Sequence, residues 1–360
     1  MRLADKKKWN SASADLQKAQ SLDPDSPLIR KNLAYVIASR GHEYFEANDW
    51  YKARDDFERA LRYDPKDSHI KLALSQVLYR LQAHTGEARK YFAEGVQGNA
   101  PKDVERRKAK QYAEEVQLEK ISREEKRGNW ILRTQEGISG FDSPQVFKTI
   151  EEVSQKTGKD FQYWIKHPLV FVLVDESKFQ KVHTGPGWAG ALNDGRIKVP
   201  VTGSFREAKK FKEVLAHEFT HSIINDFAHG HPVPFWFHEG MAQYESYRAT
   251  GEDPSRFAHY PQLEQISKAG KLLSLNTLSQ DAAAESFSSA EAALAYEEAL
   301  AFVVYLEENF RFYSLLSVLK QLGQGDSLED AMLKGIGRNF GFLEEEWRVW
   351  MHQKSKEPAR

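Results

Sequence analysis

An internal repeat in the first hundred residues limits the fold more than any other feature of this sequence. Three residues return 41 positions later in the same order: Trp9, Ala19 and Pro24 recur as Trp50, Ala60 and Pro65. A weaker third copy follows, in which two residues return 35 positions later: Ala53 and Phe57 recur as Ala88 and Phe92. Periods of roughly 34 residues are typical of paired helices that stack on one another. The repeat therefore predicts an all-α helical-repeat solenoid over residues 1–100.

The central copy has the residue spacing of a known repeat family. Its landmark positions are Gly41, Tyr44, Ala53, Phe57, Ala60 and Pro65. Small residues let two helices approach closely, aromatic rings fill the space between neighbouring pairs, and the proline ends the second helix. Residues 1–100 therefore resemble tetratricopeptide repeats, with generic helical hairpins as the alternative. The resemblance implies a groove that binds a protein partner. Since the first copy has only its second helix, we expect the first repeat to be incomplete and the natural start to lie upstream.

The remainder of the chain divides into a charged stretch and a second domain. Residues 101–128 are rich in charges of both signs and poor in large apolar residues, which favours a solvated linking helix. From residue 129 onward, short apolar segments alternate with helical ones, and an Asp194-Gly195 pair predicts a hairpin within residues 187–201. Long helical patterns dominate after Ser204. Residues 129–360 are therefore expected to form an α+β domain with a small mixed sheet and a helical C-terminal half.

Composition excludes several classes of function. The 51 basic residues balance 52 acidic ones, which argues against a dedicated nucleic-acid-binding domain. The chain lacks cysteine, so thiolate metal sites and cysteine nucleophiles are ruled out. No apolar run of about 18 residues is present, and we therefore expect no transmembrane segment. The first residues also lack the apolar core of a signal peptide.

A metal-binding pattern lies on one predicted amphipathic helix. His217, Glu218 and His221 form a His-Glu-x-x-His string within residues 205–226. Side chains four residues apart share a helical face, so both imidazoles can reach one metal ion. Glu218 borders that face, from which its carboxylate can act as a general base on a metal-activated water.

A third ligand is expected from the following helical segment. Glu239 lies 18 positions after His221 and is the main candidate. His238 competes for the role, although it would point about 100° away on a helix. His229 and His231 lie in the intervening turn and remain further candidates.

These segments together resemble a known family. The string at His217, followed by the Glu239-Gly240 pair within an E-G-x-A pattern, is similar to the gluzincin metallopeptidases, and more narrowly to the bacterial peptidase MA-like domain. Residues 187–201, 293–310 and 342–351 resemble other segments of that domain. The resemblance implies that Glu239 is the third ligand of one zinc ion and that Tyr296 stabilises the oxyanion. It also suggests the cell envelope or periplasm, where relatives with this arrangement are often found.

The expected function is hydrolysis of a polypeptide substrate, with Glu218 as general base and the repeats recruiting a protein partner or substrate. The predicted hairpin within residues 187–201 would offer an edge strand to an extended peptide. The alternative is a non-catalytic adaptor with a vestigial or structural zinc site. A structural site normally has four protein ligands, and His229 or His231 would be the candidates to complete it.

Overall fold

The computed structural model divides the chain into two compact units, Met1–Gln117 and Leu118–Arg360. The residues that it describes are 3–46, 49–80, 85–98, 117, 120–138, 142–175, 179, 192–193, 196–201, 207–229, 231–280 and 287–357.

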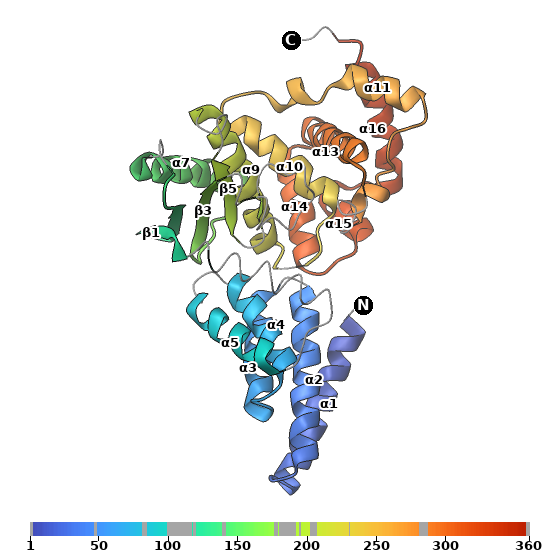
Figure 1. Cartoon of the computed structure of the whole chain (residues 1–360). Coiled ribbons are helices and arrows are strands. Elements are labelled where there is room, and N and C mark those ends of the chain that lie inside the picture. Colours follow the sequence, from blue (N-terminus) through green and yellow to red (C-terminus); the bar gives the residue numbers. More distant parts are fainter. Residues whose placement is uncertain are drawn as a thin grey trace. The chain divides into compact units, whose positions relative to one another are not determined.

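The first unit consists of helices in its described residues (Figure 1, blue to cyan). In chain order these are α1 (Leu3–Leu22), α2 (Pro27–Glu46), α3 (Trp50–Tyr63), α4 (Ser68–Arg80) and α5 (Thr85–Gly98). Successive helices pack on one another. The expectation that this region is all-α is therefore confirmed for the described residues.

The contact between α2 and α3 explains the small residues of the repeat pattern. A Cβ at Gly41 would lie only 3.0 Å from the ring of Phe57, which is itself fully buried. Arg40 adds a bidentate ion pair, because its Nε and Nη2 each lie 2.6 Å from an oxygen of the buried Asp56. Close packing of this helix pair agrees with the pattern, while assignment to the tetratricopeptide family stays a prediction.

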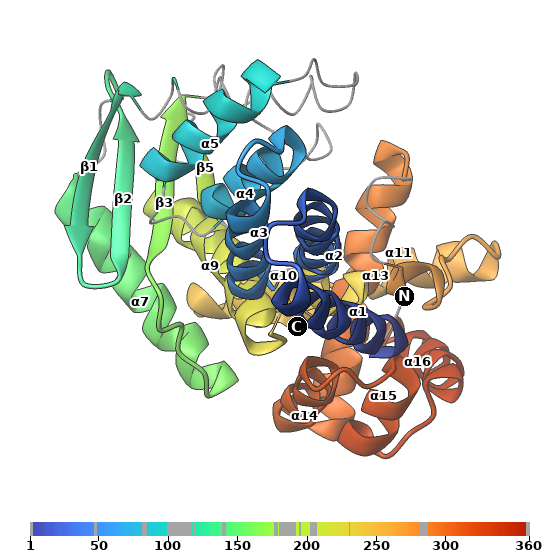
Figure 2. The same ribbon diagram turned by 90° about the horizontal axis from the view of Figure 1, so that it is seen from below.

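A five-stranded mixed sheet organises the second unit. Its spatial order is β1 (Ser122–Arg127), β2 (Trp130–Gln135), β3 (Leu169–Asp175), β5 (Ile197–Val201) and β4 (Leu192–Asn193). The central pairs β2–β3 and β3–β5 are parallel, and the outer pairs β1–β2 and β4–β5 are antiparallel. Strands β1, β2, β3 and β5 lie side by side in Figure 2. The predicted hairpin is confirmed by the pairing of β4 with β5, although Asp194 and Gly195 lie outside the described residues.

One expectation about the charged stretch is wrong. Residues 101–128 are expected to form a charged linking helix, but residues 122–127 form the edge strand β1. Residues 101–116 and 118–119 lie outside the described residues. Gly128 has a φ of +54° at the turn into β2, where Arg127 pairs with Trp130. Polar side chains suit this position, because charges on an edge strand discourage pairing with other chains.

The sheet alternates between two apolar faces. Side chains of Leu132, Phe171 and Val199 face the main core, which α7 (Ser143–Phe161) and α9 (Ala208–Phe227) complete. Their sequence neighbours Val170 and Val172 belong to a separate cluster. This alternation is what a strand buried on both faces requires.

The rest of the second unit is helical, as expected for the C-terminal half (Figure 1, yellow to red). It contains α10 (Phe235–Ala249), η2 (Pro254–Phe257), α11 (Tyr260–Lys268), η3 (Thr277–Ser279), α13 (Ser289–Phe310), α14 (Phe312–Gly323), α15 (Leu328–Ile336) and α16 (Phe340–Lys354). Among the helices of the described residues, none has both the length and the apolar character needed to cross a membrane.

A buried carboxyl on α10 links the stability of this unit to pH. Glu245 is fully buried, and neither carboxyl oxygen has a hydrogen-bond partner among the described residues. Burial, and then the negative charge of Asp160, raise the pKa of Glu245 to about 8, against the opposing charges of Arg248 and Lys156. The native state therefore holds more protons than the unfolded state between about pH 4.5 and pH 8, and Glu245 lowers stability as pH rises through that window.

Replacing Glu245 with glutamine should therefore stabilise the second unit at alkaline pH. An amide needs no proton to remain neutral, so we expect a gain of ~1–3 kcal/mol above pH 8 that shrinks toward pH 5. Thermal unfolding followed between pH 5 and pH 9 measures the effect. Glu345→Gln on the exposed side of α16 is the matched control and should change little. An equal gain for Glu245→Gln at both ends of the range would contradict the titration of this carboxyl.

Candidate metal centre

Helix α9 presents two imidazoles on one side. Its apolar residues Phe211, Leu215 and Phe219 are buried in the main core, which fixes the rotation of the helix. His217 and His221 project from another face, and their Nε2 atoms lie 3.2 Å apart. The i and i+4 spacing in the sequence thus produces the expected pair.

Helix α10 brings a carboxylate to the same point. Its buried residues Trp236 and Phe237 anchor the first turn in the core. Oε2 of Glu239 lies 3.3 Å from Nε2 of His217 and 3.5 Å from Nε2 of His221. Within the described part of the chain, these three residues form the one group of potential metal ligands, with their ligand atoms all within 4.8 Å of one another.

This group fits a zinc ion in its chemistry. Two imidazole nitrogens and one carboxylate oxygen are the donors of a common type of catalytic zinc site. Oε2 of Glu239 is buried and makes no hydrogen bond of good geometry in the described residues, despite its closeness to both imidazoles. The side chains of the three residues keep 14–20% of their surface exposed, so solvent can reach them.

Charge within the group favours an ionised carboxylate. Burial alone would raise the pKa of Glu239, but the nearby His221 and His217 hold it far below its usual value. Burial would lower the pKa of His221, but the negative charge of Glu239, its hydrogen bond to His221 and the charge of Glu218 together raise it. A cation at this point would therefore meet a carboxylate that is already charged.

His238 lies close to the group but on the opposite side of His221. The two Nδ1 atoms are 3.3 Å apart, whereas Nε2 of His221 faces Glu239 and His217. Burial, and then the neighbouring His221, lower the pKa of His238 to about 3, so its ring is neutral. A neutral imidazole here can accept a hydrogen bond from Nδ1–H of His221 and fix its orientation. The sequence indicated His238 only as a rival ligand and gave no sign of this contact.

The other two histidines do not join the group. His229 is exposed and has a φ of +52° in the turn after α9. His231 lies against Gly325, between α14 and α15. Neither residue is among the three whose ligand atoms converge.

Glu218 is buried at 6% exposure on α9, next in sequence to His217. It is not part of the converging group, and its role as general base stays a prediction. Its negative charge raises the pKa of both His221 and Tyr296, so its carboxylate lies near both side chains.

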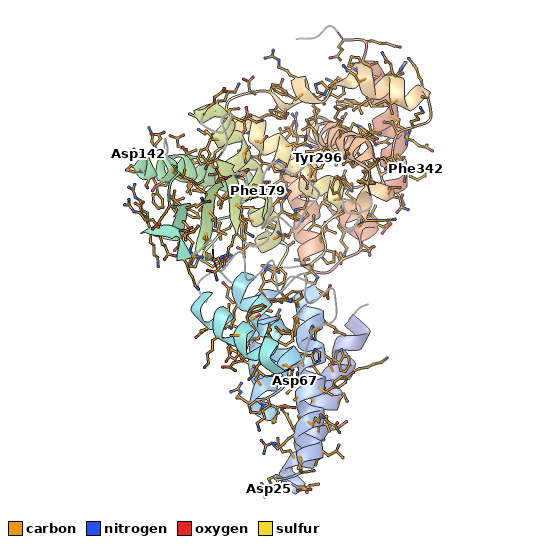
Figure 3. The ribbon with its side chains drawn as sticks, in the orientation of Figure 1. Asp25, Asp67, Asp142, Phe179, Tyr296 and Phe342 are labelled. Atoms are coloured by element: carbon orange, nitrogen blue, oxygen red, sulfur yellow. The ribbon has the colours of Figure 1, made fainter. Side chains whose placement is uncertain are left out.

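Tyr296 reaches the group from α13. Burial, the negative charge of Glu239 and a hydrogen bond to Glu239 raise the pKa of the Tyr296 phenol well above its usual value. Phe235 packs edge-on against its ring, with centroids 5.6 Å apart. Figure 3 labels Tyr296 in the second unit, and α13, on which it lies, packs against α10. The sequence-based placement of Tyr296 near the site is thus matched by the geometry, while its role stays a prediction.

Glycine at position 240 explains how α13 comes so close. A Cβ at Gly240 would lie 2.4 Å from the carbonyl oxygen of Ala299 and 2.5 Å from Cγ2 of Val303, so no larger residue fits. The residue that follows Glu239 therefore sets the separation of the two helices that carry Glu239 and Tyr296. The E-G-x-A pattern is visible in the sequence, but the reason for its glycine lies in a helix far along the chain.

Comparison with known proteins agrees with this geometry. A search among curated proteins finds no match. The family model of the Peptidase MA superfamily matches residues 165–353, which is more than half of the chain and includes α9, α10 and α13. The chain therefore belongs to the Peptidase MA superfamily.

Proposed function

We propose that this protein is a metallopeptidase that hydrolyses peptide bonds with one zinc ion held by His217, His221 and Glu239. The convergence of these three side chains is the observation that carries the proposal. Membership of a superfamily of peptidases supports it independently. When bound, zinc would polarise the scissile carbonyl and make water a better nucleophile near neutral pH.

Glu218 is the general base in this mechanism. Its carboxylate acts by its charge on His221 and Tyr296 and is not among the three converging ligands, so we expect it to take a proton from the attacking water. The same carboxyl then gives that proton to the leaving amine. Because Glu218 has to carry this proton, its carboxylate cannot also be a metal ligand.

Tyr296 is the proposed donor to the carbonyl oxygen as negative charge develops on it. Its phenol is protonated and lies beside Glu239, within reach of the group. A preorganised donor of this kind stabilises the transition state more than the ground state.

Strand β4, at the edge of the sheet and in contact with α9, is the proposed place for an extended substrate to pair.

The same geometry disfavours the structural-zinc alternative. Structural sites are usually closed by four protein ligands. In the described residues the group has three ligands, and His238 contacts the opposite nitrogen of His221.

We further propose that the helices of residues 3–98 bind a protein partner or substrate, because stacked helical pairs present extended concave surfaces.

Removal of the metal tests the proposal directly. We expect the purified protein to cleave a fluorogenic casein, to lose this activity with a chelator, and to regain it when one equivalent of zinc is added. Bound zinc should be close to one ion per chain. A protein that binds zinc but cleaves neither casein nor a peptide library would support the adaptor reading instead, and cleavage that survives complete removal of metal would overturn the zinc mechanism.

A further inference from the structure

One amide side chain contacts the backbones of two residues of the proposed site. Nε2 of Gln243 donates a hydrogen bond to the carbonyl oxygen of Tyr296 at 2.8 Å. The same nitrogen lies 3.4 Å from the carbonyl oxygen of Glu239, one turn earlier on α10. Gln243 therefore joins the backbone of a candidate ligand to that of a candidate catalytic residue on another helix.

Close packing brings α13 onto α10, and the hydrogen bond of Gln243 adds a directional contact between the two helices. Gly240 lets the helices approach at Ala299 and Val303, which sets their separation. Apolar contacts are non-directional, whereas a hydrogen bond to one particular carbonyl defines a position along the helix axis. A shift of α13 by one turn would displace Tyr296 by about 5.4 Å, which is enough to remove its phenol from Glu239.

We propose that Gln243 is a positioning residue that fixes the register of α13 on α10 and so holds the Tyr296 phenol beside Glu239. It touches neither the substrate nor the reacting atoms, and its effect on turnover is exerted through Tyr296. The catalytic part of this inference rests on the proposed peptidase function. The positional part concerns only the chain's own residues.

Gln243→Met tests the catalytic part, because methionine has nearly the same shape but no hydrogen-bond donor. We expect kcat on a peptide substrate to fall about five- to tenfold, which is the effect expected from the loss of one hydrogen bond. KM and zinc affinity should stay within about twofold of wild type. Gln265→Met on the exposed side of α11 is the control and should behave as wild type. Gln243→Asn keeps the amide but shortens its reach, and provides a second variant if methionine impairs folding.

Coupling to Tyr296 separates a positioning role from a merely structural one. Tyr296→Phe should lower kcat with zinc still bound, and adding Gln243→Met to it should cause no further loss. Additive losses in the double variant would overturn the proposal, because Gln243 would then act independently of Tyr296. An unchanged kcat for Gln243→Met or Tyr296→Phe in an active enzyme would overturn it as well.

A second readout does not depend on activity. With 3-fluorotyrosine placed at position 296, the fluorine resonance of the otherwise wild-type protein should be sharp and should shift when zinc is added. In Gln243→Met we expect the resonance to broaden or move and its response to zinc to shrink, while Gln265→Met leaves both unchanged. The same resonance in Gln243→Met and wild type would overturn the inference. Failure of wild type to cleave any peptide would reject the proposed function. The fluorine spectra would still show whether Gln243 fixes the register of α13 on α10.

Discussion

Glu218→Gln is expected to reduce peptide hydrolysis by about 10²–10⁴-fold while the zinc content stays at one ion per chain. Glutamine has the shape of glutamate but cannot take a proton from water. Glu218 lies near enough to His221 to affect its pKa but is not among the three converging ligands, so its charge is not needed to complete the ligand set. The reaction should lose its base while the metal keeps its three ligands.

Two measurements on the same samples decide this prediction: cleavage of fluorogenic casein and zinc per chain. Glu213→Gln is the matched control, because it lies five residues earlier on the same helix, outside the converging ligand group, and pairs with Lys210. It should keep both activity and zinc. Loss of zinc in Glu218→Gln would show that Glu218 is a ligand, and full activity would show that another group is the base.

The same pair of variants also distinguishes a peptidase from a zinc-binding adaptor. A peptidase loses activity with Glu218→Gln and retains it with Glu213→Gln. In a zinc-binding adaptor, wild type and both variants would be equally inactive and equally loaded with metal. A buried carboxylate next to the imidazoles serves no purpose in such an adaptor, since burial of an ionisable group costs stability.

Local helix geometry explains why part of the site could be predicted from the sequence. The four-residue spacing of His217 and His221 guarantees a shared face on any α-helix, whatever packs around it. The third metal ligand is harder to predict, because the spacing along the chain leaves two neighbouring candidates, Glu239 and His238. Glu239 and His238 differ by about 100° around α10, and the packing of α10 on α9 determines which of them meets Nε2 of His221.

Contacts between distant segments explain what the sequence did not reveal. The charged residues 122–127 form a strand because β2 lies beside them across the two-residue Gly128-Asn129 turn, a hairpin signal that the high charge of the stretch outweighed in the prediction. Gly240 and Gln243 instead meet residues of α13 that lie more than 50 positions later. Their importance becomes visible only when the two helices are packed together.

Glu239→Ala is expected to lower zinc affinity much more than His238→Ala, because the two residues face different nitrogens of His221. Removing Glu239 deletes the carboxylate oxygen that lies 3.3 Å from Nε2 of His217, and with it the negative charge of the group. We expect a loss of more than about 100-fold. Removing His238 leaves the three donors in place and takes away only the contact at Nδ1 of His221, so a loss of about 10-fold is expected, typical of a residue that orients a ligand.

Competition with a chromophoric chelator measures both affinities on a common scale. Glu239→Gln refines the comparison, since it keeps the shape and one oxygen but removes the charge that raises the pKa of His221. It should fall between wild type and Glu239→Ala. If His238→Ala instead caused the larger loss, His238 would be the third ligand, and the ring of His221 would have to turn so that Nδ1 rather than Nε2 faced the metal.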